Sequence, residues 1–415
     1  MKLHASQVYR IMGFWTSLAN ATMFTTYAIY QVIALGLNPF QLLLVGMVLE
    51  VTVLVFEGIT GVIADIYGRR LSVIVGMFVL GFGFVLEGSA IWLGEASPLV
   101  SAFVWLLLSQ VVFGIGATFV SGADTAWIVD EVGEERAGRL FLKARRAGLL
   151  GTLIGIALSV GLSAVGANLP YIIGGILYAM LGLFLLASMK ETKFVRAVRD
   201  DGASSHWRSM KATWLSGAQV IRRNPVLLMV LIVTLFSGAS SEGYDRLWQA
   251  HLIVDIGFPQ SVPITTASWI GLLALLSTLL SWPVLWMAEK RIDMSSERIV
   301  FRSMIVLTAA RIVAVLGVAL SSGFVWMLVA VLFFEIVRTL SGPIYDTWLN
   351  LNIESKSRAT VLSMMSQTDA IGQTAGGPFI GWIGHRYSMR AALVTAAVLL
   401  APVLAVYARA RQRNR

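Results

Sequence analysis

Three charged residues lie within one predicted helical turn in the segment SSEGYDRLWQAH at 240–251, just after the uncharged segment VLLMVLIVTLFSG at 226–238. They are Glu242, Asp245 and Arg246. Residues three and four apart share one face of a helix, so Asp245 and Arg246 both lie beside Glu242. Two carboxylates and one guanidinium cannot all pair, so one acid needs a further cation or a proton. We interpret Glu242 as a proton carrier or cation counter-ion, Asp245 as its titration partner and Arg246 as the group that controls their ionisation. A purely structural triad is the alternative.

The composition places this triad in a membrane. Hydrophobic residues make up 57% of the 415 residues and charged residues only 13%, and the mean hydropathy is +0.77. An ordinary globular core cannot enclose that much apolar surface. Apolar runs of about 20 residues, each long enough to cross a bilayer as a helix, recur along the chain. The sequence predicts an all-α membrane protein with about twelve spans and no soluble domain: 9–34, 39–63, 71–94, 99–128, 140–166, 169–190, 225–252, 264–288, 299–320, 322–350, 360–384 and 388–408.

The positive charges indicate the topology. The net charge is +9, but the basic residues gather in alternate loops, and the loops of the opposite side carry only Arg386 and Arg390. The positive-inside rule therefore predicts a multi-pass protein of the cell (plasma or inner) membrane with both termini in the cytoplasm. The dispersed charges argue against nucleic-acid binding. The first span lacks a small-residue cleavage site, so we expect a retained helix. Cysteine is absent, which excludes disulfides and cysteine-ligated metals, and we expect no metal or cofactor.

The two parts of the chain resemble each other. The segment SGADTAWIVDEVGEERAGRLF begins at Ser121, and SGPIYDTWLNLNIESKSRATVL begins at Ser341. Each runs from Ser-Gly through an Asp and a Trp to a charged turn. The sequence therefore predicts two pseudo-symmetric six-helix halves, 1–190 and 224–415, joined by a cytoplasmic linker at 191–223. Similarity by apolar composition alone is the alternative.

The segment GVIADIYGRR at 61–70 is the most specific motif in the chain. Its glycines permit close helix packing and a tight turn, and its basic pair anchors one membrane face. The motif resembles the signature of the major facilitator superfamily. It departs from that signature at Ile66 and matches it at Gly61, Asp65, Gly68, Arg69 and Arg70.

This resemblance implies a role for the loop. Asp65 and Arg69 would belong to a cytoplasmic latch that stabilises the outward-open state, with Asp130 at the end of the fourth span as partner. An anchor that only fixes the topology is the alternative.

The chain is also similar to the drug/proton antiporter-like members of this family, of the multidrug or tetracycline efflux type, but their further signatures are incomplete. The fourth span offers Gln110 without the expected Arg, and the fifth has Gly148, Gly151 and Gly155 without proline. We interpret these glycines as packing positions. Any proton site must use other residues.

Other charged residues lie inside predicted spans, where a charge costs roughly 2.5–3.5 kcal/mol. Glu335 and Arg338 are three residues apart, and we interpret them as an ion pair at the cavity. Arg311 lies on a span that the resemblance puts at the periphery, so we expect a structural partner and not a ligand. The remaining candidates are three acids for which interface pairing or proton carriage stays open: Glu50, Asp369 and Asp124.

Aromatic residues accompany the acids. Tyr244 and Trp248 flank the triad, Tyr30 and Gln31 lie on the first span, and Trp348 lies on the tenth. The resemblance implies that the first, fourth, seventh and tenth spans line a central cavity. Carboxylates beside aromatic rings would favour amphipathic cationic or zwitterionic solutes. Packing or interface anchoring is the alternative for each ring taken singly.

The resemblance implies a secondary active transporter that works by alternating access as a monomer. We expect proton-coupled export of amphipathic, drug-like solutes, with a small molecule, protons and the bilayer as partners. Import of a metabolite and movement of lipid are alternatives within the same fold, and a non-transporting receptor is less favoured. The four histidines form no metal or nucleophile-base arrangement, so we do not expect an enzyme.

Overall fold

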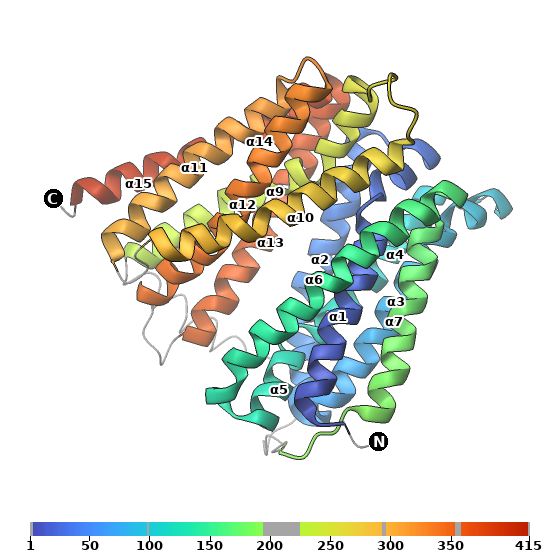
Figure 1. Cartoon of the computed structure of the whole chain (residues 1–415), viewed down its shortest axis with the longest axis vertical. Helices are drawn as coiled ribbons and strands as arrows, with labels where there is room; N and C mark the ends of the chain where they lie inside the picture. Colours follow the sequence, from blue (N-terminus) through green and yellow to red (C-terminus); the bar gives the residue numbers. More distant parts are fainter. Residues whose placement is uncertain (1–2, 98, 194–224, 293–295, 353–357, 414–415) are drawn as a thin grey trace. The chain divides into compact units, whose positions relative to one another are not determined.

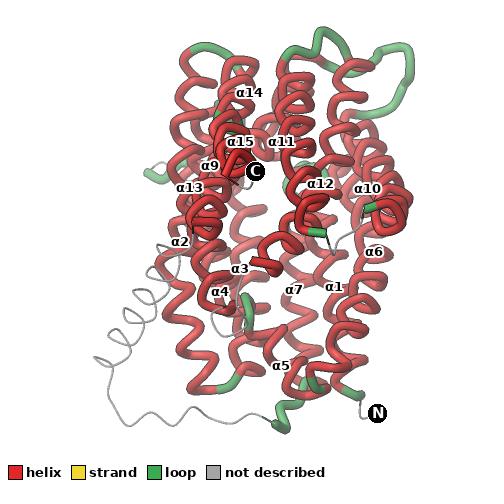
Figure 2. Tube along the Cα trace, turned by 90° about the vertical axis from the view of Figure 1, so that its left-hand side faces the viewer, coloured by secondary structure: helices red, strands yellow, loops and turns green. Residues whose placement is uncertain are grey.

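A computed structural model describes residues 3–97, 99–193, 225–292, 296–352 and 358–413. Within these residues every regular element is a helix and no strand occurs (Figure 2). Helices satisfy their own backbone hydrogen bonds, which is what an apolar chain needs where water is absent. The predicted linker at 191–223 lies outside the described residues from 194 onward.

The described helices form two compact units. The first unit, coloured mostly blue to green in Figure 1, contains α2 from Val48 onward and the start of α10, Ile264–Gly271, in addition to its own helices. Those are α1 (Ala5–Phe24), the π-helical η1 (Ile29–Ala34), α3 (Arg69–Ala96), α4 (Ala102–Val120), α5 (Ala123–Val132), α6 (Glu134–Val165) and α7 (Leu169–Ser188).

The second unit runs from yellow to red in Figure 1 and also contains the start of α2, Asn38–Met47. Its helices are α9 (Pro225–His251), the π-helical η2 (Leu252–Ile256), α10 (Thr266–Arg291) from Leu272 onward, α11 (Glu297–Ala319), α12 (Phe324–Asn352), α13 (Arg358–Arg386), α14 (Met389–Val398) and α15 (Ala401–Arg413). The helix α2 (Pro39–Tyr67) is thus divided between the two units.

The predicted fold class is confirmed: the protein is an all-helical membrane protein with twelve membrane passes in two six-helix halves. Ten described helices or helix pairs are long and apolar enough to span a bilayer by length and composition. The other two passes, which α1 and α13 form, carry more polar side chains, including Asn20 in α1 and Gln367, Asp369 and Gln373 in α13.

Glycines let helices of the first unit approach closely. A Cβ atom on Gly175 of α7 would lie 2.6 Å from the carbonyl oxygen of Gly81 on α3, and one on Gly155 of α6 would lie 2.6 Å from that of Leu18 on α1. The core beside these crossings is aromatic, with Phe84 and Tyr171 almost fully buried. The interpretation of the fifth-span glycines as packing positions agrees with this geometry.

The second unit uses the same device between α9 and α13. A Cβ atom on Gly376 would lie 2.6 Å from the Cα atom of Ala239. Its core is built around Trp348, whose ring lies 6.1 Å from that of Tyr407 and 6.3 Å from that of Phe301. The close α9–α13 contact positions the acidic residues of both helices.

We expect Gly175→Ala to destabilise the first unit by about 1–3 kcal/mol, because the added methyl group meets the backbone of α3. Gly161→Ala is the matched control, since nothing lies within 4 Å of that position on α6. The control should keep or raise the melting temperature, because alanine favours a helix. Thermal unfolding in detergent measures both variants, and equal melting temperatures would contradict the packing argument.

Candidate functional site

The second unit contains a cavity of about 610 Å³. Its walls come mainly from α9, α11, α12 and α13, with Leu400 and Tyr407 closing one side. A volume of this size fits a drug-sized molecule. Hydroxyl and apolar side chains alternate over the walls, and the charged lining residues are Asp245, Arg311, Arg338, Asp346 and Asp369.

The centre of the charge arrangement is Arg338 of α12. Its Nη1 atom lies 3.0 Å from Oδ1 of Asp245 on α9 and 3.9 Å from Oε1 of Glu335. The side chains of Arg338 and Asp245 are 56% and 40% exposed, so solutes in the cavity can reach them. The expected pairing of Glu335 with Arg338 within one helix is present, but the closer carboxylate comes from α9.

The second acid of the triad lies deeper. Nε of Arg246 donates to Oε1 of Glu242 at 3.0 Å, and Glu242 is 5% exposed. Gly46 of α2 makes room for this carboxylate, since a methyl group there would overlap it, and Gly377 of α13 lies against its Cγ atom. Of the two outcomes left open by the sequence, the structure has the second acid, Asp245, bound to a further cation.

The predicted aromatic residues lie in the cores of the units. Tyr244 is fully buried and stacks on Phe334 with ring centroids 3.6 Å apart, while Trp248 lies 6.3 Å away. Trp348 belongs to the core around Tyr407. None of the three predicted rings of the second unit lines its cavity within the described part of the chain.

Tyr30 and Gln31 lie on η1 in the first unit, where they contact a buried acid that our sequence analysis did not use as a candidate. Nε2 of Gln31 donates to Oε1 of Glu87 at 3.2 Å, and Nε2 of Gln110 donates to Oε2 at 3.0 Å. The hydroxyl of Tyr30 donates to the Glu87 backbone carbonyl at 2.8 Å. The paired glutamines are the signal that could have indicated this network.

The three second-tier acids lie in different places. Asp369 of α13 lines the cavity and accepts a hydrogen bond from Nε2 of Gln373 at 2.8 Å. Glu50 is half-buried on α2. Asp124 lies in the first turn of α5, where its carboxylate accepts from the backbone amide of Thr125 at 2.7 Å. Only Asp369 of these three belongs to the cavity lining.

Arg311 of α11 is the cavity residue that the sequence interpretation placed elsewhere. It lines the cavity, and among the described residues it has no hydrogen bond or ion pair. Its guanidinium lies 5.9 Å from the ring of Phe334. A single arginine inside an apolar span was the available signal, which the assignment of its span to the periphery outweighed.

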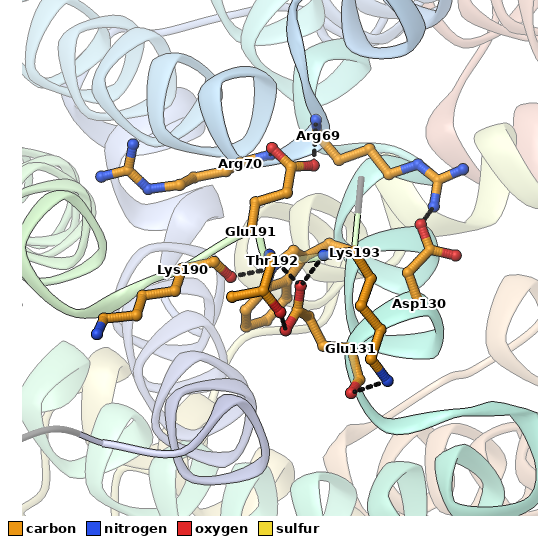
Figure 3. A network of polar contacts seen from close by, with 9 residues as sticks. Arg69, Arg70, Asp130, Glu131, Lys190, Glu191, Thr192 and Lys193 are labelled. Carbon is orange, nitrogen blue, oxygen red and sulfur yellow. Dashed lines mark hydrogen bonds and ion pairs between the residues drawn. The ribbon is translucent and has the colours of Figure 1, made fainter. Parts of the chain in front are cut away.

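The motif at 61–70 forms a polar network at one end of the first unit (Figure 3). Gly68 adopts φ 107°, which favours glycine, and ends α2 directly before α3. Arg69 forms an ion pair with Asp130 of α5, as the resemblance implied. Asp65 is exposed and makes no contact of this kind with a described residue, and Gly61 is also exposed.

Two acids beyond the motif complete this network. Glu191 accepts hydrogen bonds from the backbone amides of Arg69 at 2.9 Å and Arg70 at 3.3 Å, so it caps the N-terminus of α3. Nε of Arg70 donates to the carbonyl of Met189 at 2.7 Å. Glu131 of α5 accepts from the hydroxyl of Thr192 at 2.7 Å (Figure 3). The segment that follows α7 is therefore bound to both α3 and α5.

We expect Gly46→Ala to push the Glu242 carboxylate away from Arg246 and to destabilise the second unit by about 1–3 kcal/mol. Gly342→Ala is the matched control, because that position on α12 has no atom within 4 Å. Melting temperatures in detergent compare the two. If Gly46→Ala is as stable as the control, Glu242 is not confined as described.

A second substitution tests the cap on α3. Glu191→Ala should cost roughly 1 kcal/mol, as removal of a helix cap does, and it should speed amide hydrogen exchange at 69–72. Glu95→Ala is the control, since Glu95 is exposed near the other end of α3. Exchange measured by mass spectrometry should change only in Glu191→Ala, and unchanged exchange there would exclude the cap.

Comparison with known proteins agrees with this architecture. Residues 11–374 match the sequence profile of the Major Facilitator Superfamily. An uncharacterised MFS-type transporter of Bacillus subtilis (strain 168), YxaM, is 23% identical over 391 residues, which cover 92% of this chain and 90% of the relative.

Solved structures show the same fold. The nucleoside transporter NupG superimposes with a TM-score of 0.70 at 14% identity, covering 98% of this chain and 99% of NupG. A bacterial homologue of the human lysosomal transporter Spinster, inward-facing and occupied, gives 0.70 at 13% identity, with 98% and 96% covered. A POT family transporter in complex with 5-aminolevulinic acid gives 0.71 at 10% identity, with 97% and 94% covered. The chain belongs to the Major Facilitator Superfamily of membrane transporters.

Proposed function

We propose that this protein is a proton-coupled secondary transporter that exports amphipathic, drug-like solutes by alternating access between its two halves, with both termini in the cytoplasm. The observation that carries the proposal is the ion pair between Asp245 and Arg338 on the cavity wall. Both ions are accessible from the cavity, and a second carboxylate, Glu335, lies beside the same guanidinium.

This arrangement lets solute and proton compete for the same groups. A cationic group of a solute that binds Asp245 displaces Arg338, which can remain close to Glu335. When the solute leaves, Asp245 either pairs with Arg338 again or takes up a proton. Proton binding thus opposes solute binding at one carboxylate, which is the requirement for exchange of protons against solute.

Glu242 and Arg246 extend this site behind the cavity wall. They lie one helical turn from Asp245 on α9, and their pair is largely excluded from water. A proton that reaches Glu242 frees Arg246 to neutralise another carboxylate. We therefore assign proton carriage to Glu242 and exchange with solute to Asp245, with Arg246 and Arg338 as their counter-ions.

Proton flux tests the coupling. Liposomes that contain the purified protein and an imposed pH gradient are given lipophilic cations, tetracycline-like zwitterions or sugars. We expect an amphipathic solute to dissipate the gradient through the wild type, and Glu242→Gln or Asp245→Asn to slow this at least about tenfold, as loss of an acid–base group does. Glu95→Gln, an exposed acid outside the cavity, is the control. Solute movement without proton movement would overturn coupled transport.

Everted membrane vesicles test the direction. An exporter accumulates solute inside everted vesicles with an acid interior, whereas an importer accumulates it in right-side-out vesicles. Accumulation only in right-side-out vesicles would replace export by import, and dependence on a lipid headgroup would indicate lipid movement.

A further inference from the structure

Two cavity charges of opposite sign have no ionic partner among the described residues. Arg311 on α11 forms no hydrogen bond or ion pair there. Asp369 on α13 accepts from the neutral amide of Gln373 and forms no ion pair with a described residue. Each experiences the other's charge, yet the two lie beyond ion-pair distance. The cavity thus presents separate positive and negative sites.

The other charges of the region are already compensated. Asp245 pairs with Arg338, and Glu242 pairs with Arg246. Asp346 is exposed and near one end of α12, where water is available. Arg311 and Asp369 are therefore the charges whose compensation is left to a bound molecule. An uncompensated charge among apolar helices is unfavourable by roughly 2.5–3.5 kcal/mol, so a ligand that supplies both counter-charges is favoured.

The chemistry of the two groups defines that ligand. A guanidinium binds a carboxylate through two parallel hydrogen bonds, and no other side chain lies in its ion-pair range to compete. A carboxylate held by one amide keeps further lone pairs for an ammonium group. A solute with only a cation would leave Arg311 uncompensated, and a solute with only an anion would leave Asp369 uncompensated.

Apolar side chains lie in the same lining. Val233, Leu307 and Phe334 line the cavity together with the two charges. This surface fits the apolar body of an amphipathic molecule.

We infer that the cavity of the second unit binds an amphipathic zwitterion of the amino-acid type, with its carboxylate on Arg311 and its ammonium group on Asp369. This inference rests on the proposed transport function, whose substrate class it narrows from cations and zwitterions to zwitterions.

A charge-matched set of three probes tests the inference by equilibrium binding in detergent at neutral pH. Phenylalanine carries both charges, hydrocinnamate carries only the carboxylate, and phenethylamine carries only the ammonium group. Their naphthyl homologues repeat the series with a larger apolar body. We expect the wild type to bind the zwitterion of a series at least tenfold more tightly than either singly charged member.

Two substitutions locate the groups. Arg311→Gln should reduce zwitterion affinity to that of the amine, and Asp369→Asn should reduce it to that of the carboxylate, each by about tenfold, the effect of losing one charged hydrogen bond. Arg302→Gln, an exposed arginine on the same helix, should leave all affinities unchanged. Arg311→Lys keeps the charge and should keep the preference for the zwitterion with weaker binding.

Several results would overturn the inference. The wild-type series decides it even if a variant does not fold: equal affinity for the three members, or no binding of either series, excludes a zwitterion site. Equal losses for all three probes in Arg311→Gln would mean that Arg311 has a structural role. Because no gradient is present, binding can succeed while proton flux fails, or the reverse, so the two proposals fail separately.

Discussion

The need to compensate every charge inside an apolar helix bundle governs the second unit. Lipid offers no counter-ions and no water, so a guanidinium in α12 must find carboxylates on neighbouring helices. Arg338 does so with Asp245 of α9 and Glu335 of its own helix. The same requirement that holds α9 beside α12 therefore also creates a site at which an ionic solute can take the place of an ionic side chain.

Close backbone packing makes these charges possible. Glu242 fits between helices because Gly46 of α2 and Gly377 of α13 have no side chain to occupy its position. Asp369 lies where α13 approaches α9 at Gly238, whose missing Cβ atom leaves room for the Asp369 backbone and carboxylate. Glycine thus has two effects in this fold: it allows tight crossings, and at these crossings it leaves volume for polar side chains that larger residues would exclude.

The sequence predicted what depends on local spacing. Runs of apolar residues were sufficient for the fold class, because a bilayer fixes the length of each helix. The Glu242–Arg246 pair was also predictable, since the two residues lie four apart on one helix. The Asp245–Arg338 pair was not, because it joins residues 93 positions apart.

Which face of a helix a polar residue occupies was the least predictable property. Gln31 and Trp348 were expected at a cavity, yet Gln31 hydrogen-bonds to buried Glu87 and Trp348 packs in the core. Arg311 shows the opposite error, because the position of its span within the family outweighed its charge. A periodicity argument identifies the apolar face of a helix, but it does not distinguish a polar residue that contacts another helix from one that lines a cavity.

The two units stabilise their buried acids in chemically different ways, and this difference indicates where coupling can occur. In the first unit, neutral amides of Gln31 and Gln110 donate to Glu87. In the second, guanidinium groups bind Glu242 and Asp245. A charged solute that displaces a guanidinium exchanges one ionic bond for another, so the number of charge-assisted hydrogen bonds is kept. Displacing an amide from a buried carboxylate supplies no such replacement and leaves a buried polar group without its donor. Exchange between solute, side chain and proton is therefore energetically balanced in the second unit, and we place coupling there because only a balanced exchange is readily reversed in each transport cycle.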